Sequence, residues 1–402
     1  MLPDTSAHAV GKNHNSFVTT LTVVIAGLPG LIPLAVLPSF VGNLVDKLGF
    51  GAETAGIVVS ANLLGNALGI LVVAQLLRHI SLRKFVLVGA VIEILADVIS
   101  WQLDSAVALS SIRIVSGVGG GIITAAAYNW LSRQADPDRG FGLLICLQFA
   151  VSAALLYLLP SFTGEHGVSA FYATFILFAL LSVAVSAVLK QRPDDDLAAR
   201  TASTSKHQRV LLDKPAIARA LFAIALFEVA ASGVWAFIER IGTVWELSPG
   251  MINTVLSIGA LAGIPGALLV VVFTIRWGRA RPITIGVTVT VIGLLLLLLD
   301  ASYAWVYAVS MILFNGAWSY TIPYIQGAQA QLDPTGRIAV FGMFVVLLAI
   351  SIGPFVFGFV IGDRGYHAAI LLACGLLVSC VAVILGVARS QDRLSNRGTV
   401  SL

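Results

Sequence analysis

The sequence predicts an all-α membrane protein that crosses the bilayer many times. Of its 402 residues, 58% are hydrophobic and only 11% are charged, and the mean hydropathy is +0.95. A soluble domain has about a quarter of its residues charged, so this chain cannot cover a water-exposed surface. The apolar residues also gather in long runs separated by short polar segments, which is typical of a chain with many transmembrane helices.

Twelve apolar runs approach the length that a membrane helix needs, which is about 20 residues. The first half of the chain contains six of them, at 17–40, 54–77, 85–103, 107–131, 141–162 and 168–189. The second half contains six more, at 216–241, 251–275, 282–299, 303–325, 339–361 and 368–388. The first run is longer than the core of a cleaved signal peptide, so we expect it to remain as the first of twelve transmembrane helices.

A polar segment at 190–215 divides these runs into two equal sets. It is rich in Lys, Arg, Asp, Ser and Thr, and we expect it to be a flexible linker. The predicted organisation is a six-helix bundle at 17–189, the linker, and a second bundle at 216–388. The polar ends, 1–16 and 389–402, are predicted to be tails.

Basic residues predict the orientation of the chain. If both termini are cytoplasmic, all but four of the 24 Lys and Arg residues lie in cytoplasmic segments. The exceptions are Lys47, Arg240 and Arg364 on the outer side and Arg113 inside a span. Because Lys and Arg favour cytoplasmic loops, we expect both termini to be cytoplasmic, in a plasma membrane or a bacterial inner membrane. The net charge of +4 forms no stripe that would indicate nucleic-acid binding.

The two halves show a weak internal repeat. A shift from position 82 to position 279 places the sequence LRK on RAR, and the same shift places Asp136-Pro137 on Asp333-Pro334. Both matches fall in corresponding predicted loops. Duplicated transporters often keep such traces, so the two bundles are expected to be pseudo-symmetric.

Two basic loops resemble a motif of the major facilitator superfamily. The motif has a Gly, a Leu, an Asp-Arg pair, and then a Gly followed by basic residues. Its copies here are AQLLRHISLRKFV and VVFTIRWGRARPI, which supply Arg78, Arg83, Lys84, Arg276, Gly278, Arg279 and Arg281. Arg78 and Ile275 stand where the acid is usual. A charge relay at the cytoplasmic gate would therefore need other partners.

The fourth predicted span carries a closer match to the same family. Its sequence from Arg113 to Gly121, RIVSGVGGG, is similar to the family's fourth-helix motif. Small residues allow close packing of helices in lipid, and we expect this role for Gly117, Gly119, Gly121, Gly353 and Pro354. The resemblance implies two six-helix bundles that rock about a central site lined by the first, fourth, seventh and tenth spans.

Glu228 lies in the middle of the seventh predicted span, where an ionisable residue is expensive and is a functional candidate. The nearest basic residue on its own helix is Arg219, nine residues away. Burial disfavours the charged form of a carboxyl group without a cation beside it, so this group could exchange protons near neutral pH. The alternative is a structural acid that forms a hydrogen bond with a neighbouring helix.

Arg113 cannot lose its charge and needs an anion. The nearest candidates are Glu93 and Asp97, one turn apart on the third predicted span. Two interpretations stay open for Arg113: a structural ion pair, or a site for a substrate carboxylate or a proton relay. For the two acids, pairing or packing is favoured over substrate contact. Glu239 and Arg240 end the seventh span and are either interfacial or part of an outer gate.

Aromatic and amide side chains are expected to line the cavity. The candidates on the fourth, seventh and tenth spans are Tyr128, Asn129, Trp235, Asn315 and Trp318. Such walls suit a flat or amphipathic organic solute. Anchoring at the membrane interface is the alternative for Trp and Tyr. Asn62 and Asn66, one turn apart on the second span, are expected to form hydrogen bonds between helices.

Proline and glycine distinguish the first and fifth spans. Pro29, Pro33 and Pro38 predict a broken first helix. The run at 141–162 lacks the Gly-Pro motif that antiporters of the family carry on the fifth span, which weakens the interpretation as a drug antiporter.

No pattern of an enzyme, metal site or cofactor site is present. The six His are scattered, the three Cys lie within apolar runs, and no Gly-Lys-Ser/Thr phosphate loop occurs. The resemblance implies a secondary active transporter, monomeric in the bilayer, whose partners are a small organic solute and a proton. In this hypothesis Glu228 binds the proton and Arg113 orients it or the solute. The alternatives are a multidrug or metabolite efflux antiporter and a non-transporting membrane sensor or assembly partner.

Overall fold

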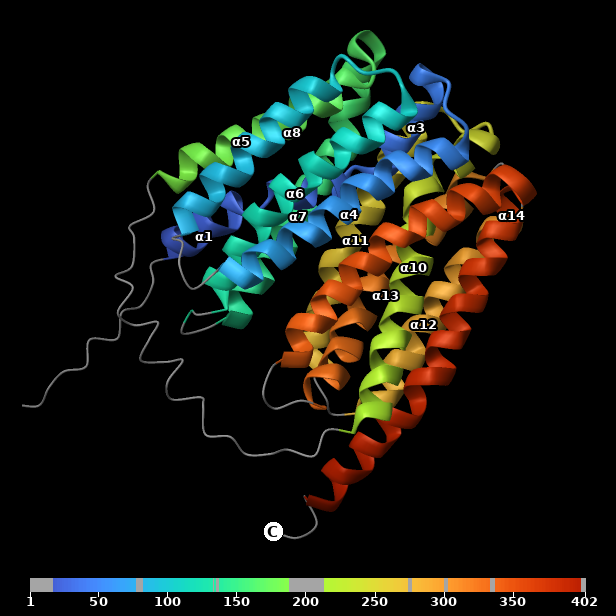
Figure 1. The fold of residues 1–402 in the computed structure, drawn as a ribbon. Coiled ribbons are helices and arrows are strands. Elements are labelled where there is room, and N and C mark those ends of the chain that lie inside the picture. The colour runs from blue at the N-terminus through green and yellow to red at the C-terminus, as the bar shows by residue number, and fades with distance from the viewer. Residues whose placement is uncertain are drawn as a thin grey trace, which may run out of the picture.

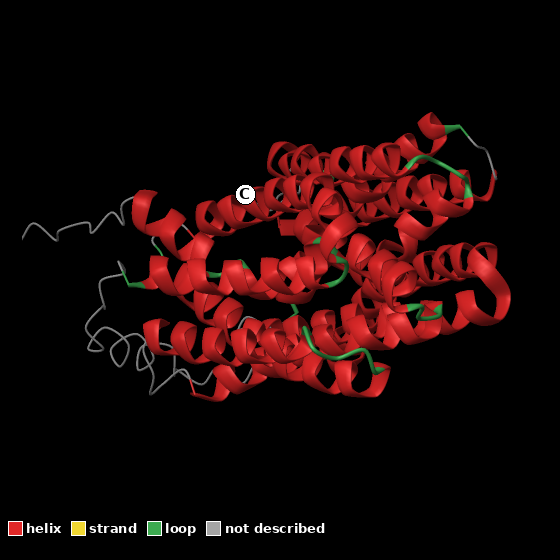
Figure 2. Cartoon of the chain, turned by 90° about the horizontal axis from the view of Figure 1, so that it is seen from above, coloured by secondary structure: helices red, strands yellow, loops and turns green. Residues whose placement is uncertain are grey.

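The computed structural model describes residues 17–76, 82–132, 134, 137–187, 213–273, 277–299, 303–332 and 337–398. Within these ranges the chain forms helices joined by turns and short loops, without strands (Figure 2). The helices up to Ser186 form one bundle and those from Lys214 onward form a second (Figure 1).

The first predicted span is broken, as its prolines indicate. It consists of α1 (Phe17–Ala26), η1 (Pro29–Leu31), α2 (Ile32–Ala35) and α3 (Leu37–Leu48). The chain bends by 52° between α1 and the segment Pro29–Ala35. Proline has no backbone N–H and its ring clashes with the preceding turn, so each new helical segment here begins with a proline at its first or second position.

The remaining helices of the first bundle follow the predicted apolar runs closely. They are α4 (Ala52–Leu76), α5 (Leu82–Ser100), α6 (Ala106–Leu131), α7 (Pro137–His166) and α8 (Ser169–Ser186). Most of them extend past the predicted apolar runs at one or both ends. A helix can continue beyond the hydrocarbon, because polar residues and water satisfy its end groups there.

Within the described residues, the second bundle consists of five α-helices and one short 3-10 helix. They are α10 (Lys214–Val244), α11 (Pro249–Phe273), α12 (Ala280–Leu296) with η2 (Leu297–Leu299), α13 (Ala304–Ala330) and α14 (Arg337–Gly398). The chain reverses within α14 at Gly365, whose φ of 78° favours glycine. The two arms of α14 contain the predicted runs 339–361 and 368–388, and the second arm continues to Gly398.

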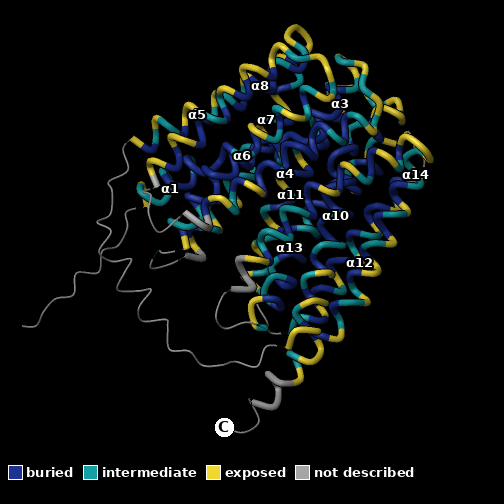
Figure 3. Tube along the Cα trace, in the orientation of Figure 1, coloured by how far each residue is buried: buried dark blue, intermediate teal, exposed yellow. Residues whose placement is uncertain are grey.

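The described helices have the dimensions and surface of membrane spans. Eight of them are long and apolar enough to cross a bilayer, and the bent segment from Phe17 to Ala35 would be a ninth. The exact number of twelve stays a prediction. The outer faces expose large apolar side chains, among them Val91, Leu95 and Val271, while the buried residues lie between helices (Figure 3). Water would disfavour such a surface, and lipid accepts it.

The two ends of the molecule differ in their basic residues. We call the end with Arg83, Lys84, Arg279 and Arg281 the basic end, and the end with Lys47 and Gly365 the far end. The predicted loop residues Arg78 and Arg276 lie outside the described residues. So do the predicted tail 1–16, the linker as far as 212, and the last residues, 399–402.

The two bundles meet at the far end and midway along their length. At the far end α4 packs on α14, where Gly56 meets Pro354 and Gly358 meets Ala52. Midway, α7 packs on α11, and Ser257 Oγ donates a hydrogen bond to the Ala153 carbonyl oxygen at 2.8 Å. Toward the basic end the ribbons of the two bundles diverge (Figure 1).

Candidate functional site

A pocket lies between the two bundles, about halfway along the molecule. Its walls come from α2, α7, α10, α11, α13 and α14, so neither bundle forms it alone. About 70 Å³ is open to the centres of water molecules, and one water needs about 10–15 Å³ of such volume. In this conformation the pocket therefore holds a few waters or one part of an organic solute.

Glu228 is the ionisable side chain of the pocket. It lies on α10, only 2% of its surface is exposed, and its Oε2 accepts a long hydrogen bond of 3.4 Å from Trp318 Nε1. Within the described part of the chain no ion pair involves Glu228, and none of the pocket-lining residues is basic. A carboxyl group in such surroundings can bind a proton or a donor group of a solute.

Aromatic rings and amides form the rest of the wall. Trp318 meets the ring of Phe149 edge-on, with centroids 6.3 Å apart, and this contact joins α13 to α7. Asn315 and Gln148 add amide groups that can donate and accept hydrogen bonds. Trp235 Nε1 donates to the Leu34 carbonyl oxygen at 3.0 Å, so α10 and α2 are joined on the side of the far end.

The structure brings four of the predicted candidates together in the pocket, namely Glu228, Trp235, Asn315 and Trp318. The other two neutral candidates, Tyr128 and Asn129, are not pocket-lining residues. Tyr128 packs edge-on against Phe141, with ring centroids 5.6 Å apart, in a cluster near the basic end of the first bundle. The Asn129 carbonyl oxygen accepts a hydrogen bond from Ser132 Oγ at 2.9 Å.

The contribution of α7 to the pocket was not predicted from the sequence. Gln148, Phe149 and Ser152 line the pocket from this helix. One signal was present, because Gln148 is the only amide side chain in the apolar run 141–162. An amide in lipid is costly without partners, so its position indicates an interior face.

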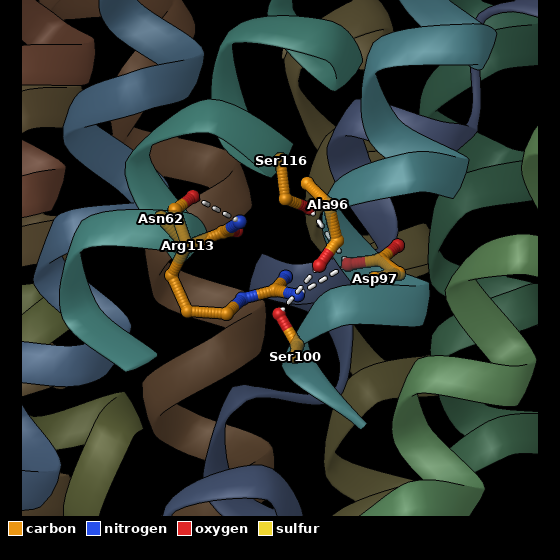
Figure 4. A network of polar contacts seen from close by, with 6 residues as sticks. All are labelled: Asn62, Ala96, Asp97, Ser100, Arg113 and Ser116. Carbon is orange, nitrogen blue, oxygen red and sulfur yellow. Dashed lines mark hydrogen bonds and ion pairs between the residues drawn. The ribbon is translucent and has the colours of Figure 1, made fainter. Parts of the chain in front are cut away.

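Arg113 lies inside the first bundle and is not among the residues that line the pocket. Figure 4 shows the polar network around it. Its guanidinium forms an ion pair with Asp97 on α5, and neither side chain is exposed. Ser116 Oγ donates a second hydrogen bond, of 2.8 Å, to the same carboxylate oxygen. Of the two predicted partners, Asp97 is therefore the one paired with Arg113. Glu93 is buried one turn away, and its Oε2 has no hydrogen-bond partner.

Aromatic rings enclose the charge of Arg113. The centroids of the rings of Phe40, Tyr172 and Phe175 lie 5.9, 5.5 and 5.1 Å from the guanidinium carbon. Such rings attract a cation through their negative faces and exclude water from it. Through its ion pair and these rings, the guanidinium joins α5 and α6 to α3 and α8, while its Nε and second terminal nitrogen are buried without a hydrogen-bond partner.

The glycines of α6 allow neighbouring helices to come close. An added Cβ at Gly117 would overlap the Asn62 backbone of α4, and one at Gly119 would overlap the backbone of α5. The amides of α4 use this closeness, as predicted: Asn62 Nδ2 donates to the Arg113 carbonyl oxygen at 3.1 Å, and Asn66 Nδ2 donates to that of Gly30 at 2.5 Å.

Three further residues expected to pack closely are also at helix contacts. Gly121 meets the backbone of Asn66, and Gly353 on α14 meets Ser232 and the backbone of α10. The carbonyl oxygen of Pro354 lies against Gly56 of α4. The helix that carries Glu228 is therefore held close to α14.

At the basic end, an acid from the C-terminal extension of α14 binds the second basic loop. Asp392 Oδ1 accepts from the Arg279 N–H at 2.8 Å, and Oδ2 accepts from the Ala280 N–H at 3.1 Å. The carboxylate thereby satisfies two free N–H groups at the start of α12. Gly278 has a φ of 71°, and a Cβ there would overlap this carboxylate. Partial burial lowers the pKa of the Arg279 guanidinium, an effect that Asp392 opposes.

The other described residues of the predicted gate loops, Arg83, Lys84 and Arg281, are exposed at the basic end. Among the described residues no cluster of three or more metal-ligating side chains occurs.

Comparison with known proteins identifies the architecture. A family model described as Major Facilitator Superfamily matches residues 19–347, which is well over half of the chain. No curated protein matches the chain at a significant level.

Solved transporter structures share the fold at low sequence identity. The xylose transporter XylE from E. coli, in a partially occluded inward open conformation, superposes with a TM-score of 0.75 at 14% identity, over 91% of this chain and 96% of that one. A D-xylose-proton symporter gives 0.72 at 15%, over 91% and 97%. The nucleoside transporter NupG gives 0.71 at 12%, over 92% and 98%.

Proposed function

Because this chain belongs to the Major Facilitator Superfamily and is a multi-pass membrane transporter rather than an enzyme, we propose that it moves a small organic solute across the membrane together with a proton. The observation that carries this proposal is Glu228, a buried carboxyl group without a cationic partner, in a pocket that the two bundles form jointly. A side chain between the two bundles gains or loses contact with water whenever the bundles move relative to each other. Glu228 is therefore the proposed site of proton binding.

The coupling follows from the free-energy cost of burying a charge. While the pocket is closed, the ionised form of Glu228 is disfavoured by desolvation, and the protonated form is accepted. When the pocket opens to one side, water reaches the carboxyl group and the proton can leave. The transition between the outward-open and inward-open states passes through the closed pocket, so its free-energy cost is lower when the proton is bound. Proton movement is thereby coupled to solute movement.

The solute is proposed to be flat or amphipathic. The rings of Trp235, Trp318 and Phe149 offer apolar faces, and the amides of Asn315 and Gln148 offer a few polar contacts. Solutes with a ring and a small number of hydroxyl or carbonyl groups can make both the apolar and the polar contacts. The structural neighbours named for nucleoside transport and D-xylose-proton symport support this size class.

The proposal includes the orientation of the molecule in the membrane. We assign the basic end to the cytoplasm, because Lys and Arg favour cytoplasmic segments. The bundles contact each other at the far end and their ribbons diverge toward the basic end, so we infer a conformation that is closed toward the outside. Arg113 is proposed to stabilise the first bundle through Asp97 rather than to contact the solute.

The test is transport by the purified protein in liposomes. Candidate solutes are first screened by thermal stabilisation, and proton flux is then followed with those that bind. The variant Glu228→Gln is expected to lose accumulation against a gradient and to keep solute exchange, because glutamine is neutral at every pH. Glu165→Gln, the same change at an acid that is 87% exposed and lies outside the pocket, should leave accumulation intact. Solute flux in the wild type that neither carries protons nor depends on pH would refute the assignment of Glu228.

Efflux of amphipathic cations is the second candidate function. A carboxylate beside Trp235 and Trp318 would also suit a cationic drug, which is attracted both by the negative charge and by the ring faces. Cells that lack the protein should then become more sensitive to a panel of toxic cations. Unchanged sensitivity, together with uptake of a neutral solute by the liposomes, would decide for the first function.

A further inference from the structure

Between α3 and α10, the contact that closes the molecule at the far end contains an ion pair. Arg240 NH1 lies 2.7 Å from Asp46 Oδ1, with 16% and 56% of the two side chains exposed. The pair joins the end of α3 in the first bundle to α10 in the second. Because the pair is partly exposed to solvent, it can break and form at a modest free-energy cost as the bundles move.

Glu239, the residue before Arg240, is left out of this pair. Its carboxyl group packs against α3, where a Cβ added at Gly42 would overlap Glu239 Oε1. The other oxygen, Oε2, is hidden from solvent and has no hydrogen-bond partner. Four polar groups surround the carboxyl group, namely Ser39 and Asp46 on α3, Arg240 on α10 and Tyr307 on α13. A fifth polar group, Tyr366 on α14, lies near Arg240 and Asp46.

Glu239 and Glu228 lie on the same face of α10. Eleven residues separate them, which is close to three helical turns, or roughly 16 Å along the axis at ~1.5 Å per residue. Trp235 lies between them on this face, lines the pocket, and donates a hydrogen bond to the Leu34 carbonyl oxygen. Glu228 therefore lies in the pocket, and Glu239 lies beyond Trp235 toward the far end.

The protonation state of Glu239 must depend on whether the far end is closed. In the closed state the carboxylate form would be buried next to the charge of Asp46, and the nearby cation, Arg240, already binds Asp46. The neutral acid avoids both penalties. When α3 moves away from α10, Gly42 no longer covers the carboxyl group, and water stabilises its ionised form.

We propose that Glu239 is a second proton-binding site, which belongs to the outer gate and whose protonation closes that gate. The proton comes from water on the far side, forms the O–H bond of the carboxylic acid, and returns to that water when the gate opens. This inference rests on the proposed function, because it assumes that the bundles alternate. It adds a separate role for the outer gate, namely that a high proton concentration outside favours the closed state.

The test measures the gate itself, without transport. Spin labels are attached to cysteines introduced at Gln102 and Val244, which are exposed at the far end of the first and second bundles. The three native cysteines, Cys146, Cys374 and Cys380, are first replaced by alanine. Pulsed electron paramagnetic resonance then gives the distance distribution in lipid nanodiscs from pH 5 to pH 9. We expect the population with the longer distance to grow as the pH rises.

Variants separate the two carboxyl groups. With Glu228→Gln as the background, the pocket acid is neutral at every pH, so the remaining pH response belongs to the gate. Adding Glu239→Gln is expected to abolish that response and leave the short distance at all pH values. The methyl group added by Gly42→Ala would occupy space that the Glu239 carboxyl group fills in the closed state. This variant should therefore increase the population of the open state at each pH. Gly51→Ala, in open space at the same end, serves as its control.

Each result decides the inference on its own. A pH response that survives Glu239→Gln, or a wild type without any response, would overturn the gate assignment. If the pH response disappears with Glu228→Gln alone, the response arises from the pocket acid, and the gate assignment is wrong. If the gate behaves as expected but Glu228→Gln still accumulates solute in liposomes, the proposed function fails and the proton site in the gate remains.

Discussion

At the scale of residues, two buried ionisable side chains that look alike in the sequence have opposite surroundings. Arg113 has an ion pair, a neighbouring serine and three rings, whereas Glu228 has a single long hydrogen bond from Trp318. A buried charge with a counter-charge is held in place, and breaking the pair leaves an uncompensated charge. An unsatisfied carboxyl group gains by binding a proton or a ligand. The free-energy cost of burying a charge thus supports a structural role for Arg113 and the proposed proton-binding role for Glu228.

Asp97→Asn tests the structural role of the Arg113 pair. It removes the counter-charge from a fully buried guanidinium, and we expect a loss of about 3–5 kcal/mol in stability. The readout is the melting temperature of the purified protein in detergent. The control is Asp363→Asn, which removes the partner of Arg364 in a pair that is 76% exposed on both sides. It should change stability by no more than about 1 kcal/mol. Equal melting temperatures for both variants would contradict this role.

At the scale of elements, the contacts of α6 and α12 depend on glycines that leave room for another group. On α6 the group is the backbone of α4 or α5, and at the start of α12 it is the carboxylate of Asp392. Helices in lipid gain little from apolar burial and are held by close packing and hydrogen bonds. Loss of the space is therefore costly even when the added group is a methyl.

Gly117→Ala should destabilise the first bundle, because its Cβ would overlap the Asn62 backbone, which cannot move without the whole of α4. We expect a lower melting temperature and a smaller yield of monodisperse protein in size-exclusion chromatography. The matched control is Gly375→Ala on α14, where nothing lies within 4 Å of the added methyl. If both variants behave like the wild type, the close contact between α4 and α6 is not needed.

Asp392→Ala should loosen the start of α12, because two backbone N–H groups lose their acceptor. Loss of such a cap costs about 0.5–2 kcal/mol. Asp392→Asn keeps one acceptor oxygen and should have the smaller effect. Hydrogen exchange followed by mass spectrometry is expected to show faster exchange over residues 279–284 for the alanine variant. Unchanged exchange in this segment would rule out the cap.

At the scale of the whole molecule, the conformation is defined by where the bundles touch. The far end is closed by α3 and α4 against α10 and α14, and the basic end diverges. The pocket lies between these two regions. A transport cycle would require the far-end contacts to break, so a covalent link across them should stop it.

The pair Glu53→Cys and Gly362→Cys provides such a link. A Cβ at Gly362 would lie 4.0 Å from that of Glu53, within the range of about 3.5–4.5 Å found in disulfides. In the background without native cysteines, oxidation is expected to abolish transport in liposomes, and reduction should restore it. Each single cysteine variant should transport under both conditions. Full transport by the oxidised double variant, with the disulfide verified by mass spectrometry, would show that the far end need not open.

Much of the architecture could be predicted from residues alone. Long apolar runs indicate membrane helices because an unpaired backbone is too costly in lipid, and Pro29 and Pro33 indicate the break in the first one because proline lacks an N–H. Glu228 was a candidate for the same energetic reason, and Asp97 was one of two predicted partners of Arg113.

The class, the approximate spans and the ionisable candidates could thus be predicted from the order of residues, because each follows from the free-energy cost of placing a polar group in hydrocarbon. Which of these groups lie close to one another depends on how the helices pack, and the structure was needed to show it. It placed Gln148 and Phe149 beside Glu228, removed Arg113 from the pocket, and brought Asp392 to the start of α12. The reason is that lipid and protein interior are both apolar, so the pattern of a membrane helix does not reveal which face meets its neighbours.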